Sequence, residues 1–383
     1  MEMKDIASLL NDKIIQNTIG VDVTIAENLD NIVDYGTALA SATATQLKDF
    51  TQVFVAGVLK NLFDTQIVEF KSLGIMKTTE EYKGIIQSVK NRALITAVSS
   101  PVGKLQNGQS YIDGTYHAPN FDNKIYDKRD SFRIPFSIPS YDQVKQSFTS
   151  IEGVNEFIAL IRANVENSRR TQLHALEKRT LNGLIVNCKN GGREIPLVTM
   201  WNADNPNDQL TDTNCQFNAL FLRYAGEKIK RIKSGAREIN TKYNDGTVYT
   251  FTPAEEINTI LLEEFATSLD FNMLSDTRNL NKVDFGTFET VPYWQNQSDE
   301  LLPTLGVTAE IKTTDGAEDN ETITTVSNVI GVVFAKDACA CSTTPMPIGV
   351  EEVGGGRFIN YFDDEITGQF VDSRNAAVIF TLN

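Results

Sequence analysis

Histidine and tryptophan are scarce in this chain of 383 residues, which contains two of each. Histidine titrates near neutral pH and is the commonest metal ligand, so two histidines leave little material for acid–base or metal chemistry. His117 falls in an extended segment and His174 in a long helical pattern, and no HExxH motif surrounds either residue. The sequence therefore predicts no catalytic residues, no metal site and no bound cofactor.

Cysteine is also sparse, and its four copies form no known pattern of ligands or disulfides. One residue separates Cys339 from Cys341, which is closer than the CxxC spacing of zinc and redox sites. Disulfide scaffolds carry more cysteines in a shorter chain. We expect these two residues, together with Cys188 and Cys215, to be free thiols in a reducing compartment.

Basic side chains are outnumbered, because 35 Lys and Arg face 50 Asp and Glu, which gives a formal net charge of −15. Binding to nucleic acid depends on clustered Lys and Arg that neutralise phosphates. The charge balance therefore argues against a nucleic-acid-binding protein. It favours an acidic soluble protein whose copies repel one another unless large apolar contacts hold them together.

The sequence has no long apolar run and no visible targeting segment. Residues 1–5 lack the basic start and the apolar run of a secretory signal. The most apolar early window, residues 53–59, is far shorter than the roughly 20 residues that a membrane-spanning helix needs. We expect a protein that is made in a cytoplasm and has no membrane partner.

Motifs for nucleotide or ester chemistry are missing as well. There is no Walker A or GxSxG sequence, and the Gly-rich residues 354–357 lack the strand and helix context of a dinucleotide site. Residues 202–212 lack the ligand order of an EF-hand calcium loop. The acidic residues 363–365 are predicted to form a solvated loop. An acidic cytoplasmic enzyme with an unrecognised carboxylate site is one alternative that these absences leave open.

The first third of the chain combines helical and extended patterns. Residues 1–65 carry apolar side chains at helical spacing, and residues 93–98 favour a strand. Residues 99–139 are extended and punctuated by glycines, with mixed charges clustered at residues 124–133, as in a solvated hairpin arm. Residues 132–138 alternate between apolar and polar, which predicts a strand with one buried face.

A short helix at residues 140–146 and then a very long helix are predicted next. Thr149 and Glu152 have the spacing of a capping box, and the helical pattern continues to about residue 187. That length corresponds to about 50 Å at 1.5 Å per residue. One polar face is predicted to form a salt-bridged surface, either within a chain or between copies. This face consists of Arg162, Glu166, Arg169, Arg170, Glu177 and Lys178.

The middle of the chain is predicted to be mixed. Residues 190–213 are rich in Asn, Asp, Gly and Pro and predict a loop, and residues 216–231 predict a helix. Asn244-Asp245-Gly246 predicts a hairpin turn between residues 239–243 and 247–251.

The rest of the chain is predicted to begin with a helix and then to be mostly strand. Thr252 and Glu255 form another capping box, which predicts a helix that reaches residue 269. Residues 313–320 predict an exposed acidic turn. The segments rich in β-branched and aromatic residues predict strands at residues 283–294, 306–312, 321–334, 357–362 and 376–382.

The order of these parts resembles the major capsid proteins of tailed bacteriophages, which have the Hong Kong 97-type fold. Residues 132–139 resemble the strand that leads into the peripheral domain of that fold. Residues 140–146 resemble its short helix, and residues 152–188 resemble its spine helix. Residues 331–338 and 372–380 resemble the return strand and the closing strand of the peripheral sheet. The resemblance covers nearly the whole chain, and the order of parts carries it.

The resemblance implies an α+β fold with five regions. Residues 1–65 are the N-terminal helical arm, and residues 66–139 are an extended β-hairpin loop followed by the strand just described. Residues 140–213 form the peripheral domain with its spine helix, and residues 214–328 form the axial domain. Residues 329–383 return to the peripheral sheet.

The resemblance also implies a structural role without enzymatic activity. Copies of the chain are expected to assemble into the pentamers and hexamers of an icosahedral phage head, which encloses double-stranded DNA without sequence-specific binding. Assembly is expected in the host cytoplasm, with the virion as final location. A portal and a separate scaffolding protein are the expected partners, because the N-terminus shows no scaffolding domain or cleavage site. An encapsulin-like compartment shell or another virion structural protein is the alternative.

Contacts between subunits are expected at charged side chains of the extended loop and the spine helix. The eight candidates are Lys124, Lys128, Arg129, Asp130, Arg133, Arg162, Arg169 and Arg170.

Overall fold

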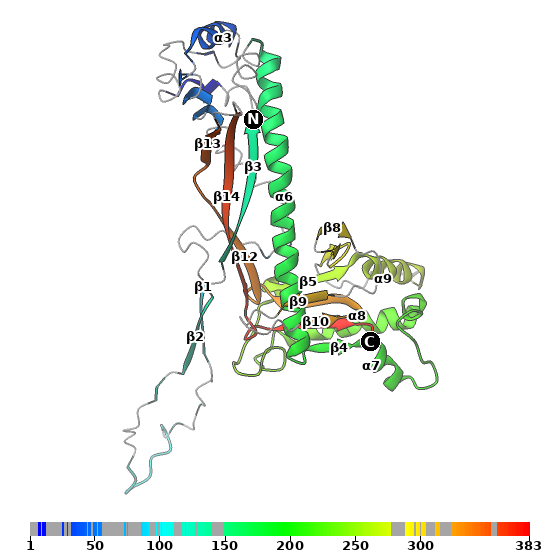
Figure 1. Ribbon diagram of the computed structural model, residues 1–383. Helices are drawn as coiled ribbons and strands as arrows, with labels where there is room; N and C mark the ends of the chain where they lie inside the picture. Colours follow the sequence, from blue (N-terminus) through cyan, green and yellow to red (C-terminus); the bar gives the residue numbers. More distant parts are fainter. Residues whose placement is uncertain are drawn as a thin grey trace.

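One long helix, α6 (Ile151–Asn190), forms the axis of the computed structural model (Figure 1). A sheet runs beside it, a small helical region lies at one end, and a larger α+β region lies at the other. The structure describes residues 149–276, 323–353 and 358–383 without a break. It also describes these shorter pieces: residues 7–8, 10–12, 25–26, 29, 32–43, 45–46, 49–51, 53–55, 73, 75, 86–91, 97, 100, 102–110, 117–118, 120–126, 129–138, 288–294, 296–298, 300–303 and 311–314.

Helix α6 confirms the predicted long helix and extends it to 40 residues, or about 60 Å. Its N-cap is Ser150, whose hydroxyl accepts a hydrogen bond from the Gly153 N–H at 3.0 Å. The cap therefore lies one residue after the predicted Thr149. Glu152 in the first turn adds a favourable charge near the positive end of the helix dipole.

The sheet beside α6 is built around β14 (Phe358–Val371). On one side β14 pairs antiparallel with β3 (Arg129–Ile138). On the other side it pairs first with β13 (Gly349–Val353) and then with β12 (Cys339–Pro345). Ile134 and Ile138 are buried on β3, which confirms the predicted strand with one buried face.

Two separate apolar clusters hold the two ends of α6. The upper cluster joins α6 residues up to Val165 to the N-terminal region, including α3 (Ile32–Ser41), and to Ile138, Ile359 and Tyr361. The lower cluster contains α6 residues from Leu176 onward. The stretch between the clusters, formed by residues 166–175 of α6 and residues 363–367 of β14, is called the central joint below.

The lower region contains a five-stranded mixed sheet in the order β4-β15-β11-β5-β6. Its strands come from distant parts of the chain, so long-range pairing closes this region. The strands are β4 (Glu194–Pro196), β5 (Ile257–Leu262), β6 (Glu289–Val291), β11 (Val329–Ala335) and β15 (Ala377–Thr381). The helices α7 (Leu197–Asp204), α8 (Ala219–Gly235) and α9 (Glu263–Asp276) contribute to the same region.

The predicted helix from residue 252 to residue 269 is wrong. A short 3-10 turn, η2 (Ala254–Glu256), is followed by strand β5, and helix α9 begins only at Glu263. Strand β5 lies between β11 and β6 and is almost entirely buried. A strand buried on both faces has a continuous apolar run, which spacing alone cannot distinguish from a buried helix.

Two other predictions for the middle of the chain need correction. Residues 190–213 contain β4 and α7 and are not a simple loop. The predicted hairpin at residues 239–251 is reduced to a single bridge between Asn240 and Thr250. The turn between them instead depends on the buried Asn244 side chain, which donates hydrogen bonds to the carbonyls of Val248 and Arg374 at 2.6 and 3.2 Å.

The remaining predicted elements differ mainly in their bounds. The helix predicted at residues 216–231 is present as η1 (Cys215–Phe217) followed by α8. The later predicted strands are present in part or extended as β6, β9 (Ile311–Thr314), β10 (Ile323–Val326), β11, β14 and β15. Short pairs β7 (Asn296–Ser298) and β8 (Glu300–Pro303), and β9 and β10, complete the described strands. The predicted short helix at 140–146 lies outside the described residues, as do most of the predicted strand at 93–98 and of the turn at 313–320.

Candidate assembly interface

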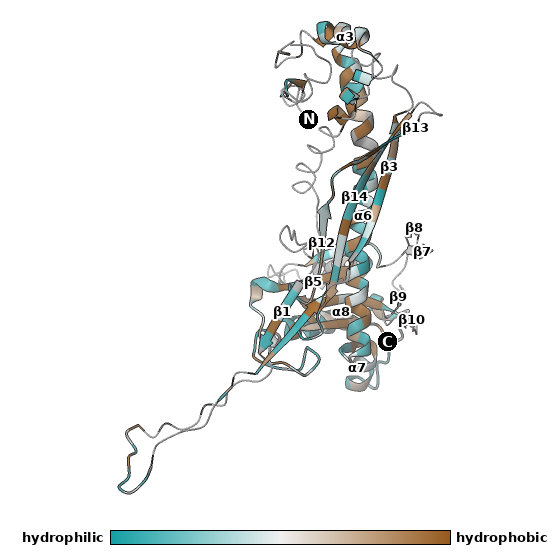
Figure 2. Ribbon diagram, turned by 60° about the vertical axis from the view of Figure 1, so that its left-hand side comes forward, coloured by the Kyte–Doolittle hydropathy of each residue, from teal (hydrophilic) through white to brown (hydrophobic). Residues whose placement is uncertain are grey.

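An antiparallel ribbon of β1 (Ile86–Asn91) and β2 (Phe121–Tyr126) forms the base of an arm, defined here as residues 86–126. Two views place residues 102–110, called the tip of the arm, away from the body (Figures 1 and 2). All described residues of this tip are exposed, and they include the apolar Val102 and Leu105. Gly103 and Gly108 adopt positive φ, a conformation that glycine adopts without steric cost.

The root of the arm is fixed to the body by the buried guanidinium of Arg374. It donates hydrogen bonds to the Asp122 carbonyl and carboxylate, both at 3.1 Å, and to the Ser88 carbonyl at 3.2 Å. It also forms two bonds of 2.9 Å with the buried Asp372 carboxylate. Burial opposes ionisation of Asp372, but the hydrogen bonds from Arg374 outweigh it and hold the pKa of this carboxyl below its ordinary value.

The opposite face of the ribbon is exposed, and it carries three apolar side chains beside the amides of Gln87 and Asn123. Residues directly opposite each other in an antiparallel pair lie on the same face. Because Val89 pairs with Asn123, it shares a face with Phe121 and Ile125. These three apolar side chains are 55%, 58% and 63% exposed. The ribbon therefore has one face bound to the body and one exposed face that carries these three apolar side chains.

The lower region exposes further apolar side chains. Phe217 and Leu220 lie at the start of α8 and are mostly exposed. Ile239, Tyr249 and Phe251 flank the bridge at residues 240 and 250 and are also exposed. Together with the arm, these residues place apolar surface at several separated points of one subunit.

Two predicted contact residues are exposed on the arm and on β3. Lys124 lies on β2 with its ammonium 5.2 Å from the centre of the Tyr126 ring. Asp130 lies on β3, where it accepts a hydrogen bond from the Ser131 N–H at 2.8 Å. Lys128 lies outside the described residues, and so do the side chains of Arg129 and Arg162.

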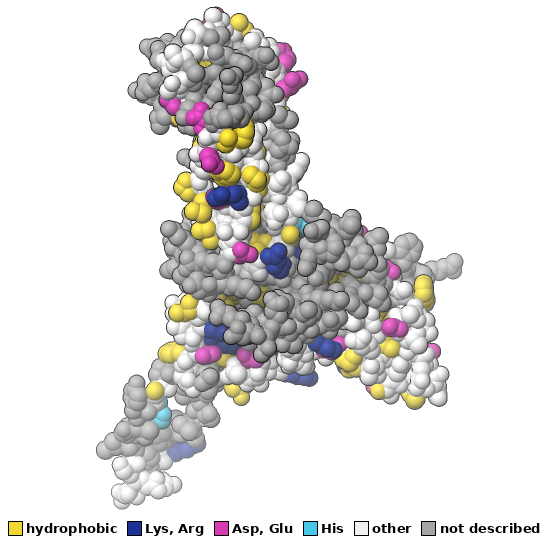
Figure 3. Space-filling view, viewed as in Figure 1, with side chains coloured by type: hydrophobic (Ala, Val, Ile, Leu, Met, Phe, Trp, Pro, Cys, Tyr) yellow, Lys and Arg dark blue, Asp and Glu magenta, His cyan; other side chains and the backbone are white. Residues whose placement is uncertain are grey.

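Arg133 and Arg170 are exposed but have partners in their own chain. Arg133 forms a two-pronged pair with Asp364 at 2.6 and 2.8 Å and lies over the Phe362 ring. Arg170 pairs with Glu166 one turn away on α6. On the face of the molecule in Figure 3, basic, acidic and hydrophobic side chains lie close to one another along the rod.

The predicted polar face of α6 requires a correction, because three of its members are buried. Arg169 is 2% exposed and forms an ion pair with Glu365 of β14, so the body of its own chain covers it. Glu177 is also buried and accepts a hydrogen bond from the Leu73 N–H at 3.2 Å. The ammonium of buried Lys178 lies 3.2 Å from the centre of the Tyr293 ring.

The acidic residues 363–365 also differ from the prediction of a solvated loop. They lie on β14, whose alternate side chains point towards α6. Asp363 and Glu365 are therefore buried, whereas Asp364 points outward to Arg133. Burial raises the pKa of Asp363 to about 6 and that of Glu365 to about 7, and Arg169 offsets this only in part.

The described residues contain no group of three or more His, Cys, Asp or Glu side chains that could hold a metal ion. The four cysteines are free, as predicted, and all four are buried. Burial raises the pKa of the Cys188 and Cys341 thiols to about 12 and that of Cys215 to about 11, so these thiols are poor nucleophiles at neutral pH.

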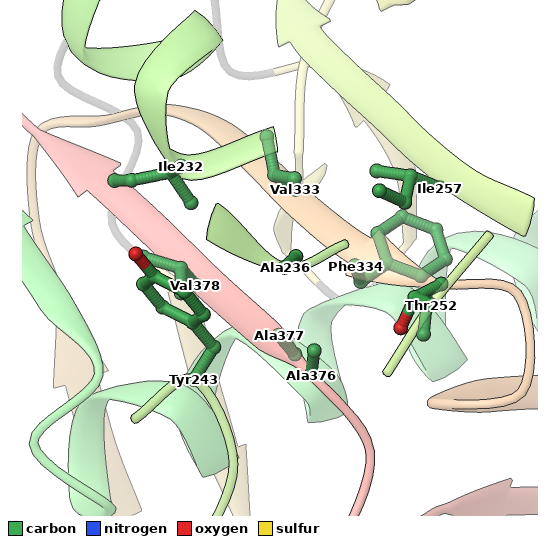
Figure 4. A pocket seen from close by; sticks show the side chains of 11 residues that line it. Ile232, Ala236, Tyr243, Thr252, Ile257, Val333, Phe334, Ala376, Ala377 and Val378 are labelled. Atoms are coloured by element: carbon green, nitrogen blue, oxygen red, sulfur yellow. The ribbon is translucent and has the colours of Figure 1, made fainter. Parts of the chain in front are cut away.

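A cavity of about 10 Å³ lies between the lower sheet and the end of α8 (Figure 4). Its lining is mostly apolar and includes Ile232, Val333 and Phe334. This volume is about that of a single water and is too small for a substrate. Among the described helices, none combines the length and the hydrophobicity needed to cross a bilayer.

Comparison with solved structures identifies the fold of the chain. The capsid structure of Staphylococcus phage Andhra matches with a TM-score of 0.50 and 10% identity, over 82% of this chain and 84% of the other. A structure described as the head fiber and inner core protein gp22 of native bacteriophage P68 matches with a TM-score of 0.48 and 11% identity, over 80% and 83%. The chain has the α+β Hong Kong 97-type fold of phage capsid subunits.

The family profile described as "Phi29-like phage major capsid protein" matches residues 25–368. The chain therefore belongs to this family, and it is a major capsid protein of a phage head. No curated protein matches its sequence. Membership implies a structural, non-enzymatic role, self-assembly into the shell and a place in the virion.

Sequence reasoning did not identify the apolar face of the arm or its anchor. The signal for the face was present, since Phe121 and Ile125 alternate with charged residues on β2. The anchor gave no local signal, because Arg374 and Asp122 are 252 positions apart.

Proposed function

We propose that this chain builds the pentamers and hexamers of an icosahedral head that encloses double-stranded DNA. The observation that supports this most directly is the arm. Its root is locked to the body by Arg374, its tip lies away from the body, and its outer face exposes Val89, Phe121 and Ile125. An arm with a fixed root and exposed apolar side chains is suited to contact a neighbouring copy of the chain.

The division of labour along the chain follows the expected regions. We assign residues 1–65 to the N-terminal arm, residues 66–139 to the extended loop and following strand, and residues 140–213 to the peripheral domain. Residues 214–328 are the axial domain, and residues 329–383 return to the peripheral sheet. The sheet in which β5 and β6 join β4, β11 and β15 supports a tight connection between the last three regions.

Charged side chains at the surface are assigned a secondary role in subunit contacts. Lys124 and Asp130 are exposed and suited to pairing with another copy. Arg133 and Arg170 are exposed as well, although they would exchange or share their present partners. Lys128, Arg129 and Arg162 are further candidates by sequence. Arg169 is not included, because it is buried in its own subunit.

Assembly is proposed to occur in the host cytoplasm with a separate scaffolding protein and a portal. The net charge of −15 supports a shell that holds DNA without sequence-specific binding, because like charges repel. Empty assembled shells should show no strong, salt-sensitive affinity for duplex DNA. Tight binding that weakens steeply with salt would contradict this part of the proposal.

The arm can be tested by replacing both Phe121 and Ile125 with Ser in the full chain. Particles are counted by electron microscopy and sedimentation, with and without the co-expressed scaffolding protein. We expect folded subunits with an unchanged thermal transition but at least tenfold fewer closed particles, because a loss of about 1.4 kcal/mol per contact already changes an association constant tenfold.

Asn123→Ser is the matched control, since Asn123 lies between the two positions on the same face of β2 and the change removes no apolar side chain, only an exposed hydrogen bond from Gln87. The control should assemble like the natural chain. Closed particles in undiminished yield from the double variant would contradict the assignment of this face to subunit contacts. The shell itself is tested with the natural chain, which should form closed particles tens of nanometres across in electron microscopy.

A further inference from the structure

The central joint places charged side chains between the two apolar clusters that hold the ends of α6. On the buried stripe of α6, Ile161 and Val165 are followed at the same spacing by Arg169. On β14, Tyr361 is followed on the inward face by Asp363 and Glu365, which are 1% and 0% exposed. The joint therefore separates the upper and lower apolar clusters with a small buried charged group.

The charges of this group do not balance when all three residues are ionised. Arg169 supplies one positive charge, and Asp363 and Glu365 supply two negative charges, so the net buried charge is −1. Burying an uncompensated charge in a protein interior is costly. Neither carboxylate oxygen of Asp363 has a hydrogen-bond partner among the described residues. One proton taken from solvent onto either carboxylate makes the group neutral.

We propose that the central joint binds one proton, and that release of this proton as the pH rises weakens the contact between α6 and β14. The proton is shared by the two carboxyl groups, and Arg169 stays charged. With the proton bound, the two ends of the rod are held at a fixed relative position. With the proton released, repulsion between Asp363 and Glu365 favours opening of the sheet from the helix at this level.

Among the described residues, the other groups around the joint add no positive charge to the buried group. From β3, the positions opposite Asp363 and Glu365 are Ile134 and Phe132, which do not titrate. From β12, the position opposite Glu365 is Pro345. Asp364 points away and is held by Arg133 of β3. On α6, Glu166 pairs with Arg170 outside the buried group.

The sign of the pH dependence follows from the direction of the shifts. Burial raises the folded-state pKa of Asp363 to about 6 and that of Glu365 to about 7. A raised carboxyl pKa contributes stability that is complete below the ordinary carboxyl range and is lost as the pH rises through the folded value. Within that window, one linked proton changes the folding equilibrium constant about tenfold per pH unit.

The test compares unfolding of the full-length subunit by urea from pH 5 to pH 8.5 in the natural chain, Asp363→Asn and Glu365→Gln. Each substitution leaves a single acid in the buried group with Arg169 and removes the extra charge. From pH 5 to pH 8.5, the folding equilibrium constant of the natural chain should fall at least tenfold more than that of each variant. His174 and Lys178 on α6 have lowered pKa values, mainly because of burial, so only this difference isolates the joint.

Asp364→Asn is the matched control, because it removes an adjacent acid on the outer face of the same strand. In this variant the free energy of unfolding should change with pH as steeply as in the natural chain. An equal slope in the natural chain, Asp363→Asn and Glu365→Gln would overturn the proposal, as would loss of the slope in Asp364→Asn.

Hydrogen exchange of the natural chain gives a second readout that does not depend on the variants folding. After correction for intrinsic rates, backbone amides of β3 and β14 should become less protected between pH 6 and pH 8, whereas those of β11 should not. Unchanged relative protection of these strands would overturn the proposal even if the variants were unstable. The proposal concerns the single subunit, so its outcome is independent of the assembly tests above.

Discussion

Replacing Arg374 with Met should loosen the arm by a predictable amount. Arg374 is buried and its guanidinium is shared between Asp372 in the body and Asp122 at the root of the arm. The substitution keeps most of the side-chain volume but leaves the buried Asp372 carboxylate without its counterion. Breaking a buried pair in this way costs about 3–5 kcal/mol, a large fraction of the roughly 5–15 kcal/mol that stabilises a folded domain.

The loss can be measured by urea unfolding of the full-length subunit, followed by fluorescence of the two buried tryptophans, Trp201 and Trp294. Arg133→Met is the matched control, because it removes an equally well-formed pair with Asp364 at the surface. An exposed pair contributes about 0–1 kcal/mol. Hydrogen exchange should show loss of protection at β1 and β2 in Arg374→Met alone.

Two further outcomes bear on the reasoning. Adding Asp372→Asn to Arg374→Met should recover part of the lost stability, because the remaining buried group is then neutral. Acidification should also narrow the gap between the natural chain and Arg374→Met. The lowered pKa of Asp372 gives the natural chain stability that is present above the ordinary carboxyl range and lost as the pH falls through the folded value. A loss in Arg374→Met no larger than in Arg133→Met would refute the argument.

Three other substitutions have defined outcomes in thermal unfolding of the subunit. Gly331→Ala places a Cβ 2.5 Å from Leu261 Cδ2 in the centre of the lower sheet and should cost about 1–3 kcal/mol. Gly235→Ala would stabilise an open helix by about 1 kcal/mol, but here the new Cβ collides with the Tyr243 hydroxyl, so we expect a net loss that Tyr243→Phe partly relieves. Ser150→Ala removes the N-cap of α6 and should cost about 1 kcal/mol; no loss would show that the cap is dispensable.

The sequence predicted the elements whose signals are local. Helix α6 and strand β3 have the 3.6- and two-residue periods that burial of one face produces, and both are confirmed. Strand β5 was mistaken for a helix because the side chains on both of its faces are buried. The strands that pair with its two edges, β11 and β6, are not adjacent to it in the chain. The apolar positions of β5 therefore repeat too densely to show a period of two.

The candidate interface was less predictable, because charge alone does not say which side chains a fold will cover. Arg169 follows the same helical pattern as the exposed Arg170, yet its partner Glu365 lies on a strand 196 positions away. A buried charge of this kind becomes visible only when the sheet is placed against the helix. The exposed apolar residues of the arm give a weak signal, because the charged Asp122 and Lys124 stand between Phe121 and Ile125 in the sequence.

Assembly of this chain must balance two opposing forces that the subunit itself displays. Each copy has a net charge of −15, so copies repel one another. Val89, Phe121 and Ile125 are each only a little more than half exposed, so covering them stabilises a contact by roughly 1–1.5 kcal/mol per side chain. Moderate salt shortens the range of the repulsion to about 8 Å without weakening apolar contacts. Association of subunits should therefore become stronger with salt, whereas contacts carried mainly by Lys124 and Asp130 would become weaker.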